Sequence, residues 1–308
     1  MGVRSLRIKF CLAIQCAVTA LALAQSSGPK KPGAEVVVLG TGTPSADPER
    51  SGPAVAIVVN NRAYLVDCGP GVVRRAAAAE KNGFQALKPT ELKTVFITHL
   101  HSDHTLGYPD LIFSPWVLGR REPLNAYGPP GLRNMTQHIE EAWSEDIAVR
   151  RHGLEQANAT GYKVVVHEIS PGVVYRDENV TVTAFAVKHG IWRQAFGYRF
   201  ETKDRRIVIS GDTAPTDEVV KMCDGCDLLF HEVYNPHGEE LKEAHWDEYF
   251  RTFHTSPAEL AEVARKARPK KLVIYHQVLE KLPESDLIEQ FKQVYAGDFA
   301  FAKDLGVY

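Results

Sequence analysis

The chain has 308 residues, of which 44% are hydrophobic and 24% are charged, and its formal net charge is −2 at pH 7. This length and composition are typical of one large globular domain or two small ones, and they exclude an intrinsically disordered chain. The net charge does not indicate the basic surface that binding to long nucleic acids requires. A local basic patch is still compatible with this net charge.

Residues 1–24 predict an export signal. Three basic residues, Arg4, Arg7 and Lys9, precede the apolar stretch "FCLAIQCAVTALALA", which ends in small residues. The stretch has 15 residues, whereas a membrane-spanning helix needs roughly 18. We therefore expect cleavage after Ala24, a mature chain without a stable membrane span, and a periplasmic or secreted protein. An uncleaved membrane anchor is the alternative.

The mature chain is expected to begin with a short polar linker, residues 25–33 ("QSSGPKKPG"), which is rich in Pro, Gly and Ser. Residues 34–308 then predict a single domain. Because the signal carries three positive charges and no negative ones, its removal moves the formal net charge from −2 to about −5. The mature protein is therefore expected to be mildly acidic.

The first half of the domain predicts short β-branched strands separated by turns and helices. Strands are expected at residues 35–40, 54–60, 63–69 and 93–99. A helix is expected at residues 71–83, and residues 124–143 predict a strand, a turn and a helix. Residues 106–119 form an apolar stretch interrupted by Pro, which is either a helix or the wall of a pocket.

The second half repeats this pattern, so the two halves together predict an α/β domain with helices outside two packed sheets. Strands are expected within residues 163–169, 180–189, 195–212, 227–234, 271–277 and 299–304. Residues 256–267 predict a helix, because Ser256 is a suitable N-cap and Glu259 completes a capping box. The segment before this helix is expected to be a loop.

The segment "THLHSDH", residues 98–104, follows the apolar run "TVFI" and predicts metal binding. Side chains alternate along an extended segment, so His99 and His101 project to the same side and can bind one ion. Asp103 and His104 lie beyond the turn and can bind a second ion. Imidazole and carboxylate are ligands that zinc prefers, and this spacing is far more specific than a single histidine.

Further ligands are expected at strand ends in the second half of the chain. His189, Asp212 and His276 each stand at or just after the end of an apolar run. Each of them alone is also explained as a polar residue at a strand end. Together with "THLHSDH" they predict a site for two metal ions. We expect two Zn²⁺ ions per chain, although manganese and iron accept the same ligands.

The chain resembles the metallo-β-lactamase superfamily, and within it the ribonuclease Z and secreted arylsulfatase branch. The resemblance spans nearly the whole mature chain and rests on "VLGTGTP", "YLVDCGPG", "THLHSDHTLGYPDL", "YGPPGL", "KHGIWRQAFGYR", "SGDT", "HTSPAELAEVA" and "KLVIYH". It implies the metallo-β-lactamase fold, a four-layer αβ/βα sandwich with a binuclear metal site at one edge of its two sheets.

The resemblance divides the seven ligands between two metal ions that share an aspartate: His99, His101 and His189 on one ion, Asp103, His104 and His276 on the other, and Asp212 between them. It implies hydrolysis by a hydroxide that bridges the metals, with Asp103 orienting or deprotonating the nucleophile.

His254, in "FHTS", resembles a family histidine that contacts the scissile phosphate, which implies assistance to the leaving group or the oxyanion. A histidine at a helix start with no catalytic role is the alternative.

Three more residues are expected to support the ligands. Asp67, in "VDCG", resembles an aspartate that braces the histidine loop through hydrogen bonds, and a plain turn carboxylate is the alternative. His231 and Glu232, in "FHEVY", match a ribonuclease Z strand that carries His-Glu-Ala-Thr. Here Val233 and Tyr234 replace the last two residues, which puts an intact tRNA-cleaving relay in doubt.

The expected substrate is a small anionic ester, either a phosphodiester or an aryl sulfate ester. Many bacterial ribonuclease Z enzymes grip tRNA with a basic arm after the Phe-Gly-Tyr strand, but "FGYRFETKDRRIVISGDT" leaves no room for that arm. A tRNA 3′ endonuclease of the ribonuclease Z type is the alternative.

Asp212 argues against β-lactamase activity, and "GTGTP" and "HTSPAEL" argue against glyoxalase II. Lactone or thioester hydrolysis and a non-catalytic zinc-binding protein are further alternatives.

Aromatic residues near the metal motif are candidates for the substrate pocket: Tyr108, Phe113, Trp116 and Trp192. Aromatic side chains commonly line small-ligand sites, but at helical spacing the same residues also fit a core. Cys223 and Cys226, in "CDGC", are expected to be a small disulfide or two free thiols rather than a redox site. A homodimer is expected from family analogy alone.

Overall fold

The computed structural model describes residues 33–238, 242–279 and 281–308. The predicted export signal, residues 1–24, and the predicted linker up to residue 32 lie outside the described residues. The described residues belong to one compact unit. No helix within these ranges is long and apolar enough to cross a membrane.

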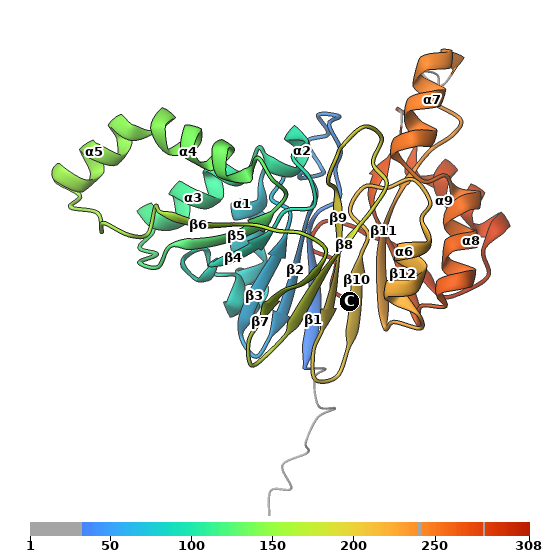
Figure 1. Ribbon diagram of the computed structural model, residues 1–308, viewed down its shortest axis with the longest axis horizontal. Coiled ribbons are helices and arrows are strands. Elements are labelled where there is room, and N and C mark those ends of the chain that lie inside the picture. The colour runs from blue at the N-terminus through green and yellow to red at the C-terminus, as the bar shows by residue number, and fades with distance from the viewer. Residues whose placement is uncertain (1–32, 239–241, 280) are drawn as a thin grey trace, which may run out of the picture. The chain divides into compact units, whose positions relative to one another are not determined.

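The first of two central sheets contains strands from the first half of the chain, paired in sequence order (Figure 1). Its strands are β1 (Ala34–Gly40), β2 (Ala54–Val59), β3 (Arg62–Val66), β4 (Thr94–Phe96), β5 (Leu124–Gly128) and β6 (Val164–Glu168). Strands β1 to β3 pair antiparallel, whereas β3 to β6 are parallel. Every residue of β2 is buried because both faces of the sheet are covered, which explains its unbroken apolar sequence.

The second sheet contains the remaining strands, again in sequence order. Its strands are β7 (Gly172–Arg176), β8 (Thr181–Ala186), β9 (Phe196–Glu201), β10 (Arg206–Ile209), β11 (Leu228–Tyr234), β12 (Lys271–Val278) and β13 (Phe299–Phe301). Strands β7 to β10 pair antiparallel and β10 to β13 pair parallel. The parallel strands of both sheets can therefore bring their carboxyl ends, and the loops that follow, to a shared edge.

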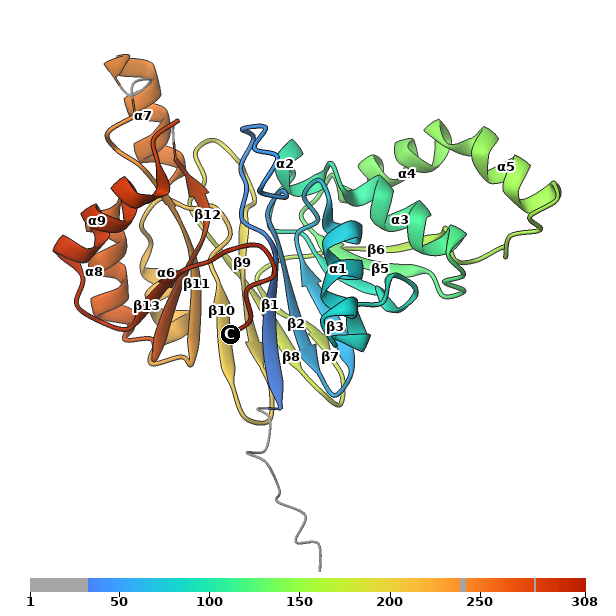
Figure 2. The same cartoon turned by 180° about the vertical axis from the view of Figure 1, so that it is seen from behind.

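Helices lie outside the two sheets, so the fold has four layers in the order helix, sheet, sheet, helix (Figures 1 and 2). The first half of the chain supplies α1 (Val72–Lys81), α2 (Ser102–Thr105), α3 (Tyr108–Val117), α4 (Leu132–Ala142) and α5 (Ser144–His152). The second half supplies α6 (Asp217–Cys223), α7 (Ala244–Phe253), α8 (Pro257–Ala267) and α9 (Glu284–Val294). Single 3-10 turns lie at Gln85–Leu87 and Pro89–Glu91. This is the αβ/βα sandwich that the sequence predicts.

An apolar layer between the sheets joins the two halves. Val38 and Phe96 from the first sheet and Tyr198, Phe200 and others from the second are fully buried in one cluster. The ring of Phe96 lies 5.5 Å from the rings of both Tyr198 and Phe200. Aromatic contacts of this kind add to the stabilisation that burial gives. The relative position of the two sheets is therefore set by close packing around the end of β4.

The chain's last residues lie along the outer edge of β1. The backbone N–H of Val36 donates to the carbonyl of Tyr308, and that of Val38 donates to the carbonyl of Gly306. The side chain of Arg205, in the turn between β9 and β10, also donates to the carbonyl of Tyr308. Residues 305–308 thus cover the edge of the first sheet and connect it to the second.

Helix α3 occupies the stretch whose sequence fitted either a helix or a pocket wall. Tyr108 and Trp116 are fully buried and Phe113 is nearly so, all within the apolar core cluster that includes the first sheet, and Phe113 stacks on Trp143, which precedes α5. The prediction that these three residues line the substrate pocket was wrong. Residues 108, 112 and 116 recur every four positions, so they share the face of the helix that packs on the sheet.

Two further features differ from, or go beyond, the sequence prediction. The segment before α8 is not a loop throughout, because it contains α7. Cys223 and Cys226, at the end of α6, form a disulfide, and Cys68 is a buried free thiol. The predicted helix at residues 256–267 is present as α8, with the capping box of Ser256 and Glu259.

Asp177, in the turn after β7, links the two sheets. Its carboxylate accepts hydrogen bonds from Tyr64 on β3 and from Tyr175 on β7, both at 2.7 Å. It also accepts from the backbone N–H groups of Asn179 and Val180. Burial alone would raise the pKa of Asp177, but these hydrogen bonds outweigh burial and hold that pKa below its usual value.

Replacing this carboxylate by Asp177→Asn is expected to lower the free energy of unfolding at pH 7 by about 1–3 kcal/mol, because charged hydrogen bonds are lost. The pKa is lower in the folded chain, so this stabilisation is present above the unfolded value of about 3.9 and is lost as the pH falls through the folded value. Urea unfolding at pH 7 and pH 2 measures the difference, which should shrink at the lower pH. The exposed neighbour serves as control: Glu178→Gln should change stability little, and an equal loss in both variants would contradict the assignment.

Candidate metal centre

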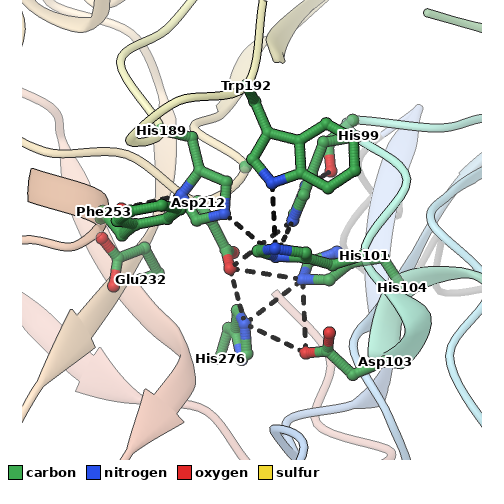
Figure 3. A network of polar contacts seen from close by, with 12 residues as sticks. His99, His101, Asp103, His104, His189, Trp192, Asp212, Glu232, Phe253 and His276 are labelled. Carbon is green, nitrogen blue, oxygen red and sulfur yellow. Dashed lines mark hydrogen bonds and ion pairs between the residues drawn. The ribbon is translucent and has the colours of Figure 1, made fainter. Parts of the chain in front are cut away.

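The seven predicted ligands meet at one edge of the two sheets (Figure 3). They follow strand ends or lie in the next short element: His99 and His101 after β4, Asp103 and His104 in α2, His189 after β8, Asp212 after β10, and His276 in β12. Their ligand atoms form two groups, each with all atoms within 4.8 Å of one another: His99, His101, His189 and Asp212 in the first, and Asp103, His104 and His276 in the second.

The first group presents three imidazole nitrogens to one point. Nδ1 of His101 lies 3.0 Å from Nε2 of His99 and 3.1 Å from Nε2 of His189. Nitrogens bound at about 2.0–2.1 Å to a tetrahedral zinc ion lie roughly 3.3 Å apart, so the observed spacing is close to that of a metal site. Burial lowers the pKa of His189 to about 4 and also lowers the pKa of His99, which favours the neutral, metal-binding form.

The second group lies next to the first, and Asp212 faces both. The Nε2 atoms of His104 and His276 are 3.2 Å apart, and Oδ2 of Asp103 lies 3.6 Å from each of them. Oδ2 of Asp212 lies 3.0 Å from Nε2 of His276 and 3.4 Å from Nε2 of His104. The same oxygen is 3.9 Å from Nε2 of His99 in the first group. Asp212 therefore has the position of a ligand shared between two ions.

Charge and hydrogen bonding at this centre fit two cations. Oδ1 of Asp212 is buried without a hydrogen-bond partner among the residues described, and a buried carboxylate oxygen is unfavourable unless a donor or a cation faces it. Burial alone would lower the pKa of His104 and of His276, but the charges of Asp212 and Asp103, together with the hydrogen bond to Asp212, outweigh burial and raise both pKa values. Positive charge at this centre is therefore favourable, and metal ions would supply it in place of protons. The ligand types accept zinc, manganese and iron alike.

Asp67 braces the loop that carries four of the ligands. Its buried carboxylate accepts hydrogen bonds from the backbone N–H and the hydroxyl of Thr98, at 2.8 and 2.9 Å. Nδ1 of His104 lies 2.8 Å from the same carboxylate. This contact keeps the proton of His104 on Nδ1 and turns Nε2 toward the other ligands, as ligating histidines generally require. Asp67 thus occupies the bracing position that the sequence predicts.

Backbone carbonyl groups orient two other ligands in the same way. Nδ1 of His189 lies 2.9 Å from the carbonyl oxygen of Phe253, and Nδ1 of His276 lies 2.9 Å from that of Gly42. A carbonyl oxygen can only accept, so both Nδ1 atoms must donate, which leaves each Nε2 free to bind a metal. Phe253 ends α7, so this helix takes part in positioning His189.

His254 lies beside the metal ligands and is held by Glu232. Nδ1 of His254 is 3.3 Å from Oε2 of Glu232, whose Oε1 accepts from the backbone N–H of Thr255 at 2.8 Å. Burial and the charge of Asp212 raise the pKa of Glu232 well above its usual value. Burial lowers the pKa of His254 to about 4, so its ring is neutral. A protonated Glu232 would donate to Nδ1, which places the ring proton of His254 on Nε2.

His231 does not join this arrangement. Its Nδ1 contacts the carbonyl oxygen of Glu232 at 2.7 Å, and its Nε2 has no hydrogen-bond partner within the described part of the chain. Neighbouring residues on a strand point to opposite faces of the sheet. Because Glu232 faces His254, His231 faces the other way, and its predicted role in supporting the ligands was wrong.

The metal ligands open into a hollow of about 330 Å³, which we call the metal cleft. Asp103, Asp212, His254 and His276 line it together with Trp246, Tyr249 and Phe250 of α7. The sequence prediction missed the residues of α7 because this segment was interpreted as a loop. A signal was present: the aromatic residues at 246, 250 and 253 recur at spacings of three and four, which is typical of one helix face.

Trp192 is the one predicted pocket aromatic that reaches the centre. It lies between His189 and β9, and its Nε1–H points at Nε2 of His101 at a distance of 2.9 Å (Figure 3). The ring centroids of Trp192 and His101 are 4.9 Å apart. Trp192 also lines a second hollow, next to the metal cleft.

Comparison with known proteins gives consistent matches. A profile described as "Beta-lactamase superfamily domain" matches residues 62–277. A ribonuclease Z of Mycobacterium bovis (strain BCG / Pasteur 1173P2) is 30% identical over 276 residues, which cover 88% of this chain and 95% of the relative. The crystal structure of human tRNase Z, short form, matches with a TM-score of 0.65 and 27% identity, over 89% of this chain and 98% of that one. The metallo-β-lactamase fold protein YhfI from Bacillus subtilis matches with a TM-score of 0.67 and 19% identity, over 89% and 99% of the two chains.

Titration of metal-stripped protein with Zn²⁺ is expected to saturate at two ions per chain and to change the fluorescence of Trp192. A metal ion on Nδ1 of His101 leaves the ring proton on Nε2, so the indole N–H loses its acceptor. Elemental analysis after dialysis measures the stoichiometry, and tryptophan emission reports the change at the indole.

Two variants separate these effects. Trp192→Phe should still bind two ions and lose most of the fluorescence change, whereas His189→Ala should retain only one ion after dialysis. Two retained ions in His189→Ala, with unaltered affinity, would argue against the assignment of this histidine as a ligand.

Proposed function

The chain belongs to the metallo-β-lactamase superfamily, and we propose that it is a metal-dependent hydrolase of phosphodiester bonds. The observation that carries this proposal is the convergence of seven ligand side chains in two adjacent groups with a shared aspartate. Two-metal sites of this kind suit the displacement of an oxygen from phosphorus, because both the attacking and the leaving oxygen can be stabilised. The ribonuclease Z relatives give further support, since a ribonuclease acts on phosphodiester bonds.

The chain's own residues would assist this reaction as follows. Two bound metal ions would lower the pKa of a water molecule and neutralise charge on the phosphoryl oxygens. The carboxylate of Asp103 lines the metal cleft and would orient that water as a hydrogen-bond acceptor. His254 lines the same cleft, and its Nε2–H would donate to an oxygen of the phosphate or of the leaving group.

The comparisons favour a ribonuclease Z-type reaction over hydrolysis of a small ester. The Mycobacterium bovis relative and the human relative are matched over 95% and 98% of their own lengths. The first candidate substrate is therefore a tRNA precursor, cleaved at its 3′ side.

One observation favours a second candidate, a small phosphodiester or an aryl sulfate ester. Residues 202–205 alone connect β9 to β10, so the arm that the resemblance led us to expect in a tRNA-cleaving enzyme has no segment at this place. The metal cleft, at about 330 Å³, also has the size of a small-ligand site. We propose export to the periplasm or the medium from the predicted signal, which would separate the protein from tRNA.

The test uses residues 25–308 loaded with zinc and three substrates: bis(p-nitrophenyl) phosphate, p-nitrophenyl sulfate and a tRNA precursor with a 3′ trailer. Diester hydrolysis is expected, with a loss of at least about 100-fold in His101→Ala and Asp212→Ala, because removal even of groups that only support a ligand costs 10- to 100-fold. Initial rates and bound zinc are measured on the same samples.

Each outcome separates the candidates. Cleavage of the tRNA precursor at one site supports the ribonuclease Z-type reaction, and diester turnover without it supports a small-molecule phosphodiesterase. A preference for the sulfate ester would replace the phosphodiesterase proposal with an arylsulfatase. No turnover with two zinc ions bound would overturn both, and lactones and thioesters would be tested next, before a purely zinc-binding role is accepted.

Glu232 gives a sharper test of the proton arrangement at His254. Glu232→Gln is expected to keep most of the activity, because an amide N–H can donate to Nδ1 of His254 as the protonated acid does. Glu232→Ala should lower kcat by about 10- to 100-fold, as for other groups that orient a site residue. Kinetics at constant zinc content measure the effect. Equal losses in both variants would show that the carboxylate acts in its charged form instead.

A further inference from the structure

A second hollow of about 710 Å³ lies directly beside the metal cleft, and we call it the apolar cleft. Its walls come from four segments, the first three being Leu100 within the ligand loop, Pro129 and Pro130 before α4, and the loop of Ile191 and Trp192. Tyr249 and Phe253 of α7 complete it. Its volume lies within the range of small-molecule sites, and apolar and aromatic lining is typical of them.

The apolar cleft and the metal cleft are contiguous. Both are lined by His101 and by Tyr249. A molecule with its reacting centre at the metal ligands would therefore reach the apolar cleft through an adjoining group. Of the two clefts, only the metal cleft is lined by Asp103, Asp212, His254 and His276, so the reacting centre would lie there and an attached group would extend past His101.

Flat ring faces form much of the boundary. Tyr249 and Phe253 stack at a centroid distance of 4.3 Å with an angle of 21° between their planes. The ring of Phe253 is nearly parallel to that of His101, at 6.4 Å and 16°. Trp192 adds an indole edge-on to His101. Ring faces arranged in this way favour a planar aromatic guest, because aromatic pairs gain energy beyond the burial of their area.

Arg193 supplies a positive charge at the same cleft. Its side chain is exposed, and no ion pair or hydrogen bond to it occurs in the described parts of the chain. An unpaired guanidinium can stack on an aromatic ring and can also attract an anion. This combination suits a planar aromatic group attached to a phosphate better than an alkyl chain.

We propose that the apolar cleft binds the aromatic group, an aryl ring or a nucleobase, that is esterified to the phosphate held at the metal centre. This inference rests on the proposed phosphodiesterase function and names the substrate class within it. The cleft would act mainly on affinity, because its residues lie beside the reacting atoms rather than at them. Ile191 is 92% exposed, so a bound ring would remove apolar surface from water at this position.

The test measures binding rather than turnover, so it does not depend on hydrolysis. Calorimetry on the zinc-loaded protein compares 1-naphthyl phosphate with methyl phosphate, two monoesters that carry the same anionic group. We expect the naphthyl ester to bind about 10- to 100-fold more tightly, from the apolar area that its rings bury. The double variant Ile191→Ser/Arg193→Lys keeps the positive charge but removes the apolar side chain and the planar guanidinium, so it should lower this ratio by roughly tenfold while methyl phosphate binds as before.

Matched controls use exposed residues away from both clefts. Leu154→Ser/Arg121→Lys makes the same chemical changes, and it should keep the wild-type ratio and zinc content. A ratio near one in the wild-type protein would overturn the inference, and so would a high ratio that the cleft variant does not lower. Absence of diester turnover with the naphthyl preference intact would instead count against the proposed function alone.

Discussion

The metal centre depends on the hydrogen bonds that the buried carboxylate of Asp67 accepts. This carboxylate connects the end of β3 to the segment after β4 through Thr98, and to α2 through His104. Hydrogen bonds to a buried charge are strong, because the low local dielectric leaves them little screened. Asp67 itself has a backbone φ of 59°, a left-handed conformation that is uncommon for residues other than glycine. The fold therefore keeps an unfavourable backbone conformation at Asp67, the residue whose carboxylate holds the loop of four ligands in place.

The remaining ligands come from the second sheet, so the centre exists only when the two sheets pack correctly. Phe96, which ends β4 just before the ligand loop, packs against Tyr198 and Phe200 of β9. Asp212 follows β10 and His276 lies in β12, two parallel strands of that second sheet that flank β11. Since protein interiors are closely packed, a displacement in this layer would be transmitted to the distances between the two ligand groups. Metal binding and the packing of the sheets are therefore coupled, as in other sites assembled from distant segments.

Much of the centre could be predicted from sequence, because its signals are local. "THLHSDH" shows its ligand spacing directly, and His189, Asp212 and His276 stand at or beside strand ends whose apolar runs are easily recognised. The errors arose where tertiary context decides. Tyr108 and Trp116 have the chemistry of pocket residues, but the sheet beneath α3 makes them core. His231 could have been separated from Glu232 by strand alternation alone, whereas the contribution of α7 to the clefts depends on how the chain folds back over the ligands.

The C-terminal residues along β1 have a consequence for self-association. A sheet edge with unpaired backbone groups is a template on which another chain can add a strand, and natural proteins protect such edges. Residues 305–308 fill that role on β1. Within the described chain, the other edge strands are β6 in the first sheet and β7 and β13 in the second. Strand addition to this protein is therefore expected at these strands rather than at β1, and Val165 on β6 and Val173 on β7 present exposed apolar side chains.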